Sequence, residues 1–246
     1  MNKKGVSHVE VILAFLLFIF AVFFILTLFP PWQAAVPQDN SKINQLLLKF
    51  QQNASTELSE MGIQMNNAGN QLNNVNNLAF FIPLSQENLN SRIADIDGSI
   101  FDSYPQQNGS GYEICAQAQN GNWPYFFYIR TSQRIAQSSL DSSACPPSVN
   151  EAYYTITSTE QRKVLSEKGI LDLNDSYYGN YSALKSYLGV SGQDNFDFMI
   201  NFSDGKIIEG KTEIPQNLNV NSINKRMEVL RLDGETGFAD VNIRIW

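Results

Sequence analysis

Histidine and cysteine supply the side chains of many enzyme and metal sites, and this chain of 246 residues has one histidine and two cysteines. The histidine, His8, lies just before a long apolar segment, so a serine or cysteine nucleophile in the rest of the chain has no histidine base. The same scarcity leaves too few ligands for an ordinary zinc site. We therefore predict no enzymatic activity, no metal site and no cofactor.

Two pairs of aspartates leave one catalytic alternative open. Asp95 and Asp97 precede Gly98, and Asp194 and Asp197 lie close together further along. The first pair lacks the other ligands of an EF-hand loop, and aspartate beside glycine commonly forms turns. An enzyme that uses only carboxylates stays as an alternative, because the sequence does not show which acidic residues converge.

Composition limits the class of protein further. The chain is 43% hydrophobic, which is enough for a folded core, and it has 17 basic against 24 acidic residues, for a net charge of -7. A broad electropositive surface is therefore not expected, and we predict no nucleic-acid partner.

The apolar residues are concentrated near the N-terminus. The segment 11–29 has Thr27 as its only polar residue, and as a helix it would span about 28 Å, roughly one hydrocarbon core. Lys3 and Lys4 precede it, and Pro30-Pro31 should end the helix. We predict a single-pass membrane protein with a cytoplasmic N-terminus and an extracellular main domain, by the positive-inside rule.

The run Lys3-Lys4-Gly5-Val6-Ser7-His8-Val9-Glu10, followed by apolar residues, resembles the class III signal peptide of type IV pilins and archaeal pilin-like proteins. The resemblance implies that a prepilin peptidase cuts between Gly5 and Val6. Glu10 would then be the fifth residue of the mature chain and an assembly residue. The partners implied are the membrane, the peptidase and other pilin-like subunits, contacted through the N-terminal helix. Many archaeal members have glutamine where this chain has Val6, and Pro30-Pro31 interrupts a helix that pilins usually continue, which favours a minor component.

These observations divide the chain into four segments. They are a leader at 1–5, a hydrophobic anchor and assembly helix at 6–29, a linker at 30–40 and an extracytoplasmic β-rich domain at 41–246.

Within 41–246, periodicity predicts one helix followed by many strands. Ile43, Leu46, Leu47 and Phe50 recur with helical spacing after Ser41, a suitable cap. A second helix is expected at 181–188, ended by glycine. Strands are expected at 61–65, 78–82, 112–118, 123–129, 153–157, 196–201, 206–208, 227–232 and 241–246, with a hairpin turn at 203–205. The predicted fold class is α+β and mainly β: a transmembrane helix followed by an antiparallel β-sheet or β-sandwich with one or two short helices.

Covalent modifications are suggested at two kinds of position. Cys115 and Cys145 form an even pair in a segment placed outside the cell, so we predict a disulfide contributing about 3–4 kcal/mol, with two separate buried thiols as the alternative. Five Asn-x-Ser sequons permit glycosylation, at Asn53, Asn108, Asn174, Asn180 and Asn201.

Aromatic residues crowd the segment 123–128, which contains Trp123, Tyr125, Phe126, Phe127 and Tyr128. They could form a surface on which sugars stack. A strand buried on both faces explains them more simply.

Besides an enzyme that uses only carboxylates, the sequence leaves two other functions open. The first is a pilin-like structural subunit of a type IV pilus-related surface filament. The alternative is a membrane-anchored extracellular binding or adhesion module whose surface ligand is unknown.

Overall fold

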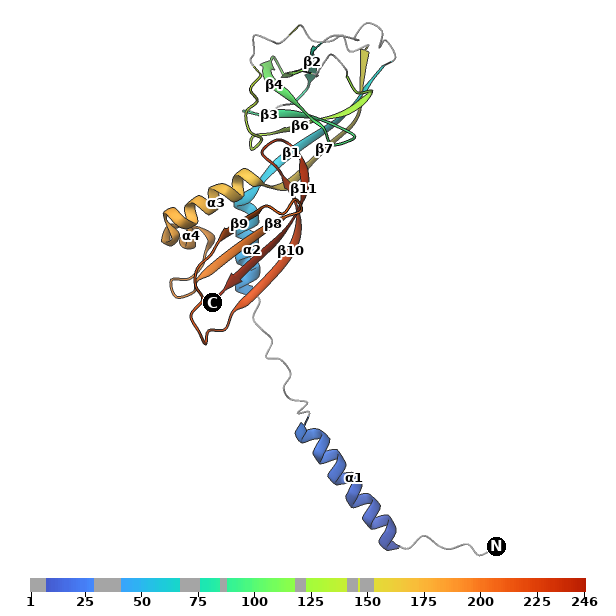
Figure 1. Cartoon of the computed structure of the whole chain (residues 1–246), viewed down its shortest axis with the longest axis vertical. Helices are drawn as coiled ribbons and strands as arrows, with labels where there is room; N and C mark the ends of the chain where they lie inside the picture. The colour runs from blue at the N-terminus through green and yellow to red at the C-terminus, as the bar shows by residue number, and fades with distance from the viewer. Residues whose placement is uncertain are drawn as a thin grey trace, which may run out of the picture. The chain divides into compact units, whose positions relative to one another are not determined.

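The computed structural model describes residues 8–28, 41–66, 76–84, 88–117, 123–140, 146 and 153–246. The chain divides into two compact units, Met1–Asn40 and Ser41–Trp246. The first unit contains helix α1, His8–Leu28, and the second, here called the body, contains all the other helices and strands (Figure 1).

The membrane-anchor prediction is corrected by the helices of the structure. Among the described residues, no helix is both long and apolar enough to cross a membrane. The expected transmembrane element of the fold class, and the single-pass localisation with its extracellular domain, are therefore not supported. The mainly β character of the chain is confirmed.

An open eleven-stranded sheet organises the body, in the order β2-β5-β4-β3-β6-β1-β7-β10-β11-β8-β9. Its pairs are antiparallel except where β7 runs parallel to β10, with Val229 opposite Leu165. The strands are β1 (Ser55–Met65), β2 (Asn77–Ile82), β3 (Asn90–Asp95), β4 (Ile100–Asn108), β5 (Gly111–Gln117), β6 (Phe126–Ser132), β7 (Tyr154–Ser166), β8 (Phe196–Phe202), β9 (Ile207–Gly210), β10 (Asn221–Leu230) and β11 (Thr236–Ile245).

Three helices cover one face of the C-terminal strands: α2 (Ser41–Ala54), α3 (Glu167–Gly179) and α4 (Tyr181–Leu188). Helix α2 confirms the predicted periodicity, because its four apolar positions are all buried. They pack into one core with alternate residues of β8 and β11. Within this core, the ring centroids of Phe50 and Phe198 lie 5.1 Å apart. One or two short helices were expected in the body, and its described residues form three.

Local chemistry explains where α3 and α4 begin and end. Ser166 caps α3 by accepting a hydrogen bond from the Gly169 amide, and Asn180 caps α4 by accepting one from the Ala183 amide. Gly189 ends α4 with a φ of 74°, as predicted for a glycine there. Gly169 also lets α3 approach α2, because a Cβ at this position would lie 2.5 Å from the carbonyl oxygen of Ala54.

A second core fills the N-terminal half of the sheet. Phe80 of β2 packs against Phe127 of β6 with ring centroids 5.4 Å apart, and Ile63 of β1 and Ile114 of β5 join the same cluster. Because β2 and β5 lie several strands from β1 and β6 in the sheet order, this contact requires the sheet to curl over on itself.

The aromatic strand is not buried on both faces. Phe127 is fully buried, whereas Phe126 and Tyr128 are partly exposed and Tyr125 is 56% exposed. Successive side chains of β6 alternate between the core and the opposite face of the sheet, so burial of the whole cluster was a wrong expectation.

Candidate functional site

Helix α1 presents apolar side chains in every direction. Its side chains are described from Val11 to Phe24, and all except Ile19 are exposed; Leu17 is 63% and Phe20 is 70% exposed. None of these residues is polar, so this part of α1 has no polar face and is not amphipathic. A helix that is hydrophobic all round needs cover from other molecules, so α1 is the strongest candidate for an interaction element.

One of the residues implied by the signal-peptide resemblance lies in the described part of the chain. Glu10 belongs to the first turn of α1. Gly5 and Val6 lie outside the described residues, so the proposed cleavage junction stays a prediction.

Cys115 lies on β5, is 1% exposed and is disulfide-bonded. Among the described residues there is no free cysteine. Cys145, the other cysteine of the chain, lies outside the described residues.

The five sequon asparagines occupy different environments. Asn108 and Asn201 are exposed on strands, and Asn180 is exposed as the cap of α4. Asn53 is partly buried, and its amide donates to the Lys49 carbonyl and accepts from the Tyr187 hydroxyl. The side-chain oxygen of Asn174 is buried without a hydrogen-bond partner. Exposure therefore favours Asn108, Asn180 and Asn201 as positions an enzyme could reach.

Three of the four aspartates in the two pairs, Asp95, Asp194 and Asp197, have side-chain partners that are structural. The Asp95 carboxylate accepts from the Ile96 amide in the turn that leads into β4. Asp194 accepts from Ser191 and Lys42, and these contacts lower its pKa, with the Ser191 hydrogen bond contributing most. Asp197 is almost fully buried and pairs with Arg244. In the described part of the chain, no three metal-ligating side chains gather at one point.

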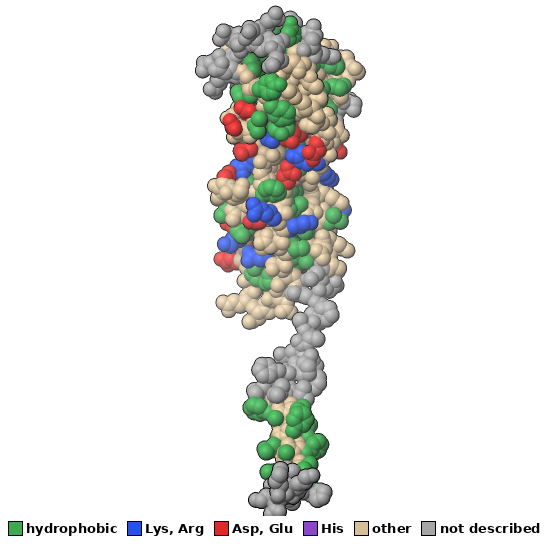
Figure 2. Space-filling model, turned by 90° about the vertical axis from the view of Figure 1, so that its right-hand side faces the viewer, with side chains coloured by type: hydrophobic (Ala, Val, Ile, Leu, Met, Phe, Trp, Pro, Cys, Tyr) green, Lys and Arg blue, Asp and Glu red, His purple; other side chains and the backbone are tan. Residues whose placement is uncertain are grey.

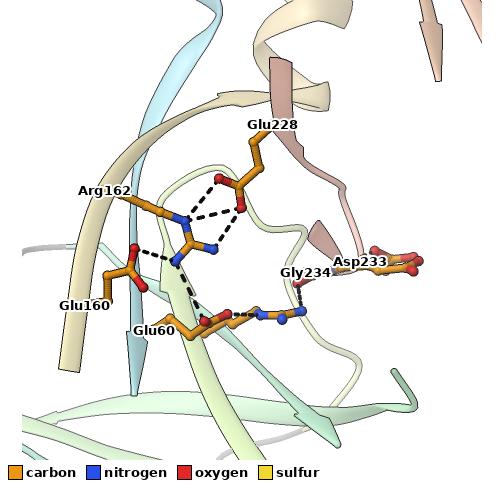
Figure 3. A network of polar contacts seen from close by, with 8 residues as sticks. Glu60, Glu160, Arg162, Glu228, Asp233 and Gly234 are labelled. Carbon is orange, nitrogen blue, oxygen red and sulfur yellow. Dashed lines mark hydrogen bonds and ion pairs between the residues drawn. The ribbon is translucent and has the colours of Figure 1, made fainter. Parts of the chain in front are cut away.

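A charged network joins neighbouring strands of the sheet, with Arg162 directed toward Glu60, Glu160 and Glu228 (Figure 3). Arg162 of β7 donates three hydrogen bonds of 2.8 to 3.2 Å to the Glu228 carboxylate of β10. Its remaining terminal nitrogen lies 3.7 Å from Glu60 and 3.5 Å from Glu160, and it is buried without a hydrogen bond. The hydrogen bond to Glu228 is the main cause of a raised pKa for Arg162.

The network continues from β1 to β6 and β3, the next strands in the sheet. Arg130 of β6 donates to Glu60 at 2.5 Å and to the Gly234 carbonyl at 3.3 Å. The adjacent Arg92 is 7% exposed, and burial lowers its pKa although Asp102 and Asp233 oppose the change. Gly234 has a φ of 89°, and a Cβ there would lie 2.6 Å from the Cβ of Arg92, so the β10–β11 turn fits over the arginines only with glycine.

Figure 2 shows acidic and basic side chains gathered across the middle of one side of the body. The contacts join β6 and β1, which contribute to one hydrophobic core, to β7 and β10, which contribute to the other. The network is therefore suited to holding the two halves of the body in register. The network could not be predicted from the sequence, because its hydrogen-bonded members are 66 to 104 residues apart along the chain.

Comparison with known proteins found no match. No protein-family description, no curated protein and no solved structure is significantly similar to this chain.

Proposed function

We propose that the chain is a pilin-like structural subunit that assembles with further copies of itself through α1. The observation that carries this proposal is the exposure of apolar side chains all round α1, from Val11 to Phe24. Burying one such side chain stabilises an assembly by roughly 1.5–3 kcal/mol, so a bundle of α1 helices has a large driving force.

The class III signal-peptide resemblance suggests how the register between neighbouring α1 helices is selected. Removal of 1–5 would place a new amine on Val6, close in sequence to Glu10. In a bundle of apolar helices an unpaired carboxylate costs several kcal/mol, so the carboxylate of Glu10 requires a cationic partner such as that amine. Such a pair would form at one axial offset between neighbouring helices and would thereby select the register of assembly.

The body fits the role of a folded unit carried by each copy. It has its own two cores and a sheet braced by ion pairs, so its folding does not need residues of α1. Copies could therefore join through α1 while each body stays folded.

The test compares the chain that starts at Val6 with two variants of that chain by electron microscopy and sedimentation. Leu17→Glu places a charge on α1 where the side chain is 63% exposed, and Leu218→Glu places the same charge on the body at a site 50% exposed. We expect the unmodified chain and Leu218→Glu to form filaments of regular repeat and Leu17→Glu to stay dispersed. A monomeric unmodified chain, amorphous aggregates alone, or intact filaments of Leu17→Glu would contradict the proposal.

A further inference from the structure

A shallow trough lies on the face of the C-terminal sheet opposite the three helices. Its central hollow, of about 390 Å³, is lined among others by Asn201 of β8, Arg226 of β10, and Phe238 and Asp240 of β11. A hollow of about 210 Å³ follows along the same strands at Asn242. The two hollows are neighbours on this face, because Asn201 and Met199 of β8, like Asp240 and Asn242 of β11, are two residues apart along their strands.

The charged groups at the centre of the trough are not paired with each other. Arg226 and Asp240 lie directly opposite in the β10–β11 register, yet they form no ion pair in the described structure. The guanidinium of Arg226 instead lies over the Phe238 ring, 5.4 Å from its centroid. Asn201 is opposite Asp240 on the other side and is exposed.

One end of the trough differs from its centre. At the Asn242 end, Arg244 donates to Asp197 at 2.8 Å. This arginine is therefore already neutralised, whereas the centre keeps one carboxylate, one guanidinium and one amide available to a ligand.

These groups match the chemistry of a sugar. A carboxylate accepts hydrogen bonds from hydroxyl groups, a guanidinium donates to them, and an amide does both. Phe238 is 52% exposed and offers an apolar ring surface beside them, which the C–H face of a pyranose can cover. Pockets that bind small ligands commonly combine such an apolar surface with a few convergent polar groups.

Other ligand classes fit the trough less well. Asp240 in the centre and a net charge of -7 disfavour a polyanion. The backbone groups of β11 are bonded to β10 and β8, so an extended peptide could not add to the sheet here.

From these observations we propose that the trough binds a neutral oligosaccharide, with Phe238 as the stacking surface and Asp240, Arg226 and Asn201 as the hydrogen-bonding groups. The proposal is independent of assembly through α1, because it uses only residues of the body.

The test is calorimetric titration of the full-length chain with neutral hexasaccharides of glucose, mannose and N-acetylglucosamine. Phe238→Ala and Asp240→Ala remove one recognition group each. Tyr187→Ala is the matched control, because it removes an aromatic ring that is 64% exposed on α4, away from the trough. We expect one hexasaccharide to bind, both trough variants to weaken it by about tenfold or more, and the control to stay within about twofold.

The proposal would be overturned if none of the three hexasaccharides bound, or if Phe238→Ala bound as tightly as the unmodified chain. Binding only to heparin, used as an anionic probe, would also overturn it. A change in sedimentation caused by Phe238→Ala would indicate a second copy in the trough instead of a sugar. Intact-mass analysis of native protein adds one more arm: a glycan attached to Asn201 itself would fill the trough and also overturn it. The melting temperature of each variant verifies that it is folded.

Discussion

Arg162 of β7 holds the Glu228 carboxylate of β10 at the junction where these two strands run parallel, with its closest contact at 2.8 Å. The parallel pairing itself is short, with two residues of each strand in register. The ion pair thus reinforces the narrowest connection in the sheet, between the strands of the N-terminal half and the C-terminal half.

Replacing Arg162 with Met should therefore destabilise the body. The substitution leaves Glu228 and Glu60 without this cation, and both are partly buried, with side-chain exposures of 30% and 16%. Loss of one partner of a fully buried pair costs about 3–5 kcal/mol, and solvent screening reduces this here to about 1–3 kcal/mol. Urea unfolding measures the change. Lys168→Met, at a pair 4.0 Å apart and about half exposed, is the control and should cost less than about 0.5 kcal/mol.

Tyr177 should make stability fall at high pH. Burial raises the pKa of its phenol to about 12, against the opposing hydrogen bond with Thr212. The unfolded chain, with a pKa of about 10, loses this proton first, so the stabilisation is complete below pH 10 and disappears between pH 10 and 12. Melting temperatures measured from pH 9 to 12 should fall more steeply for the unmodified chain than for Tyr177→Phe. Parallel curves would contradict this assignment.

The disulfide of Cys115 should contribute measurably to stability. Since the chain has two cysteines, we expect non-reducing peptide mapping to recover Cys115 joined to Cys145. Reduction should lower the melting temperature, because the cross-link is expected to stabilise the folded state by about 3–4 kcal/mol. Recovery of disulfide-linked dimers in place of an internal bridge would show that the bond joins two chains.

Glu10→Ala tests the assembly role of this carboxylate. We expect the variant to be processed to a chain that starts at Val6 and to fail in filament formation, because the charge that selects register is gone. N-terminal sequencing and electron microscopy measure the two properties separately. Glu10→Gln, which keeps the size of the side chain, is the matched variant and should behave like Glu10→Ala. Normal filaments from either variant would remove Glu10 from the assembly mechanism.

The sequence predicts a helix where the spacing of apolar residues and the residues at the helix ends both indicate one. The apolar spacing after Ser41 indicates α2, and Gly189 marks the end of α4. Helix α3 was missed because Gly169 and the segment 174–176 are poor helix formers, although Ile170, Leu173 and Tyr177 show the required spacing. Gly169 is there because α2 leaves no room for a side chain, which is tertiary information that sequence does not contain.

Strands β3 and β4 were missed for a related reason. Asp95 to Gly98 was interpreted only as a turn, and the strands on either side of it carry polar and charged residues such as Arg92 and Asp102. The burial of Arg92 in β3 depends on partners in other strands. The trough likewise depends on which residues of β8, β10 and β11 lie opposite one another, and register between strands cannot be read from one sequence.

Helix α2 runs directly into β1, which lies inside the sheet with β6 on one side and β7 on the other. Tension applied along the chain at Ser41 would therefore load the hydrogen bonds of two ladders together, in shear, instead of opening one pair after another. Extraction of β1 from the body thus requires both ladders to break.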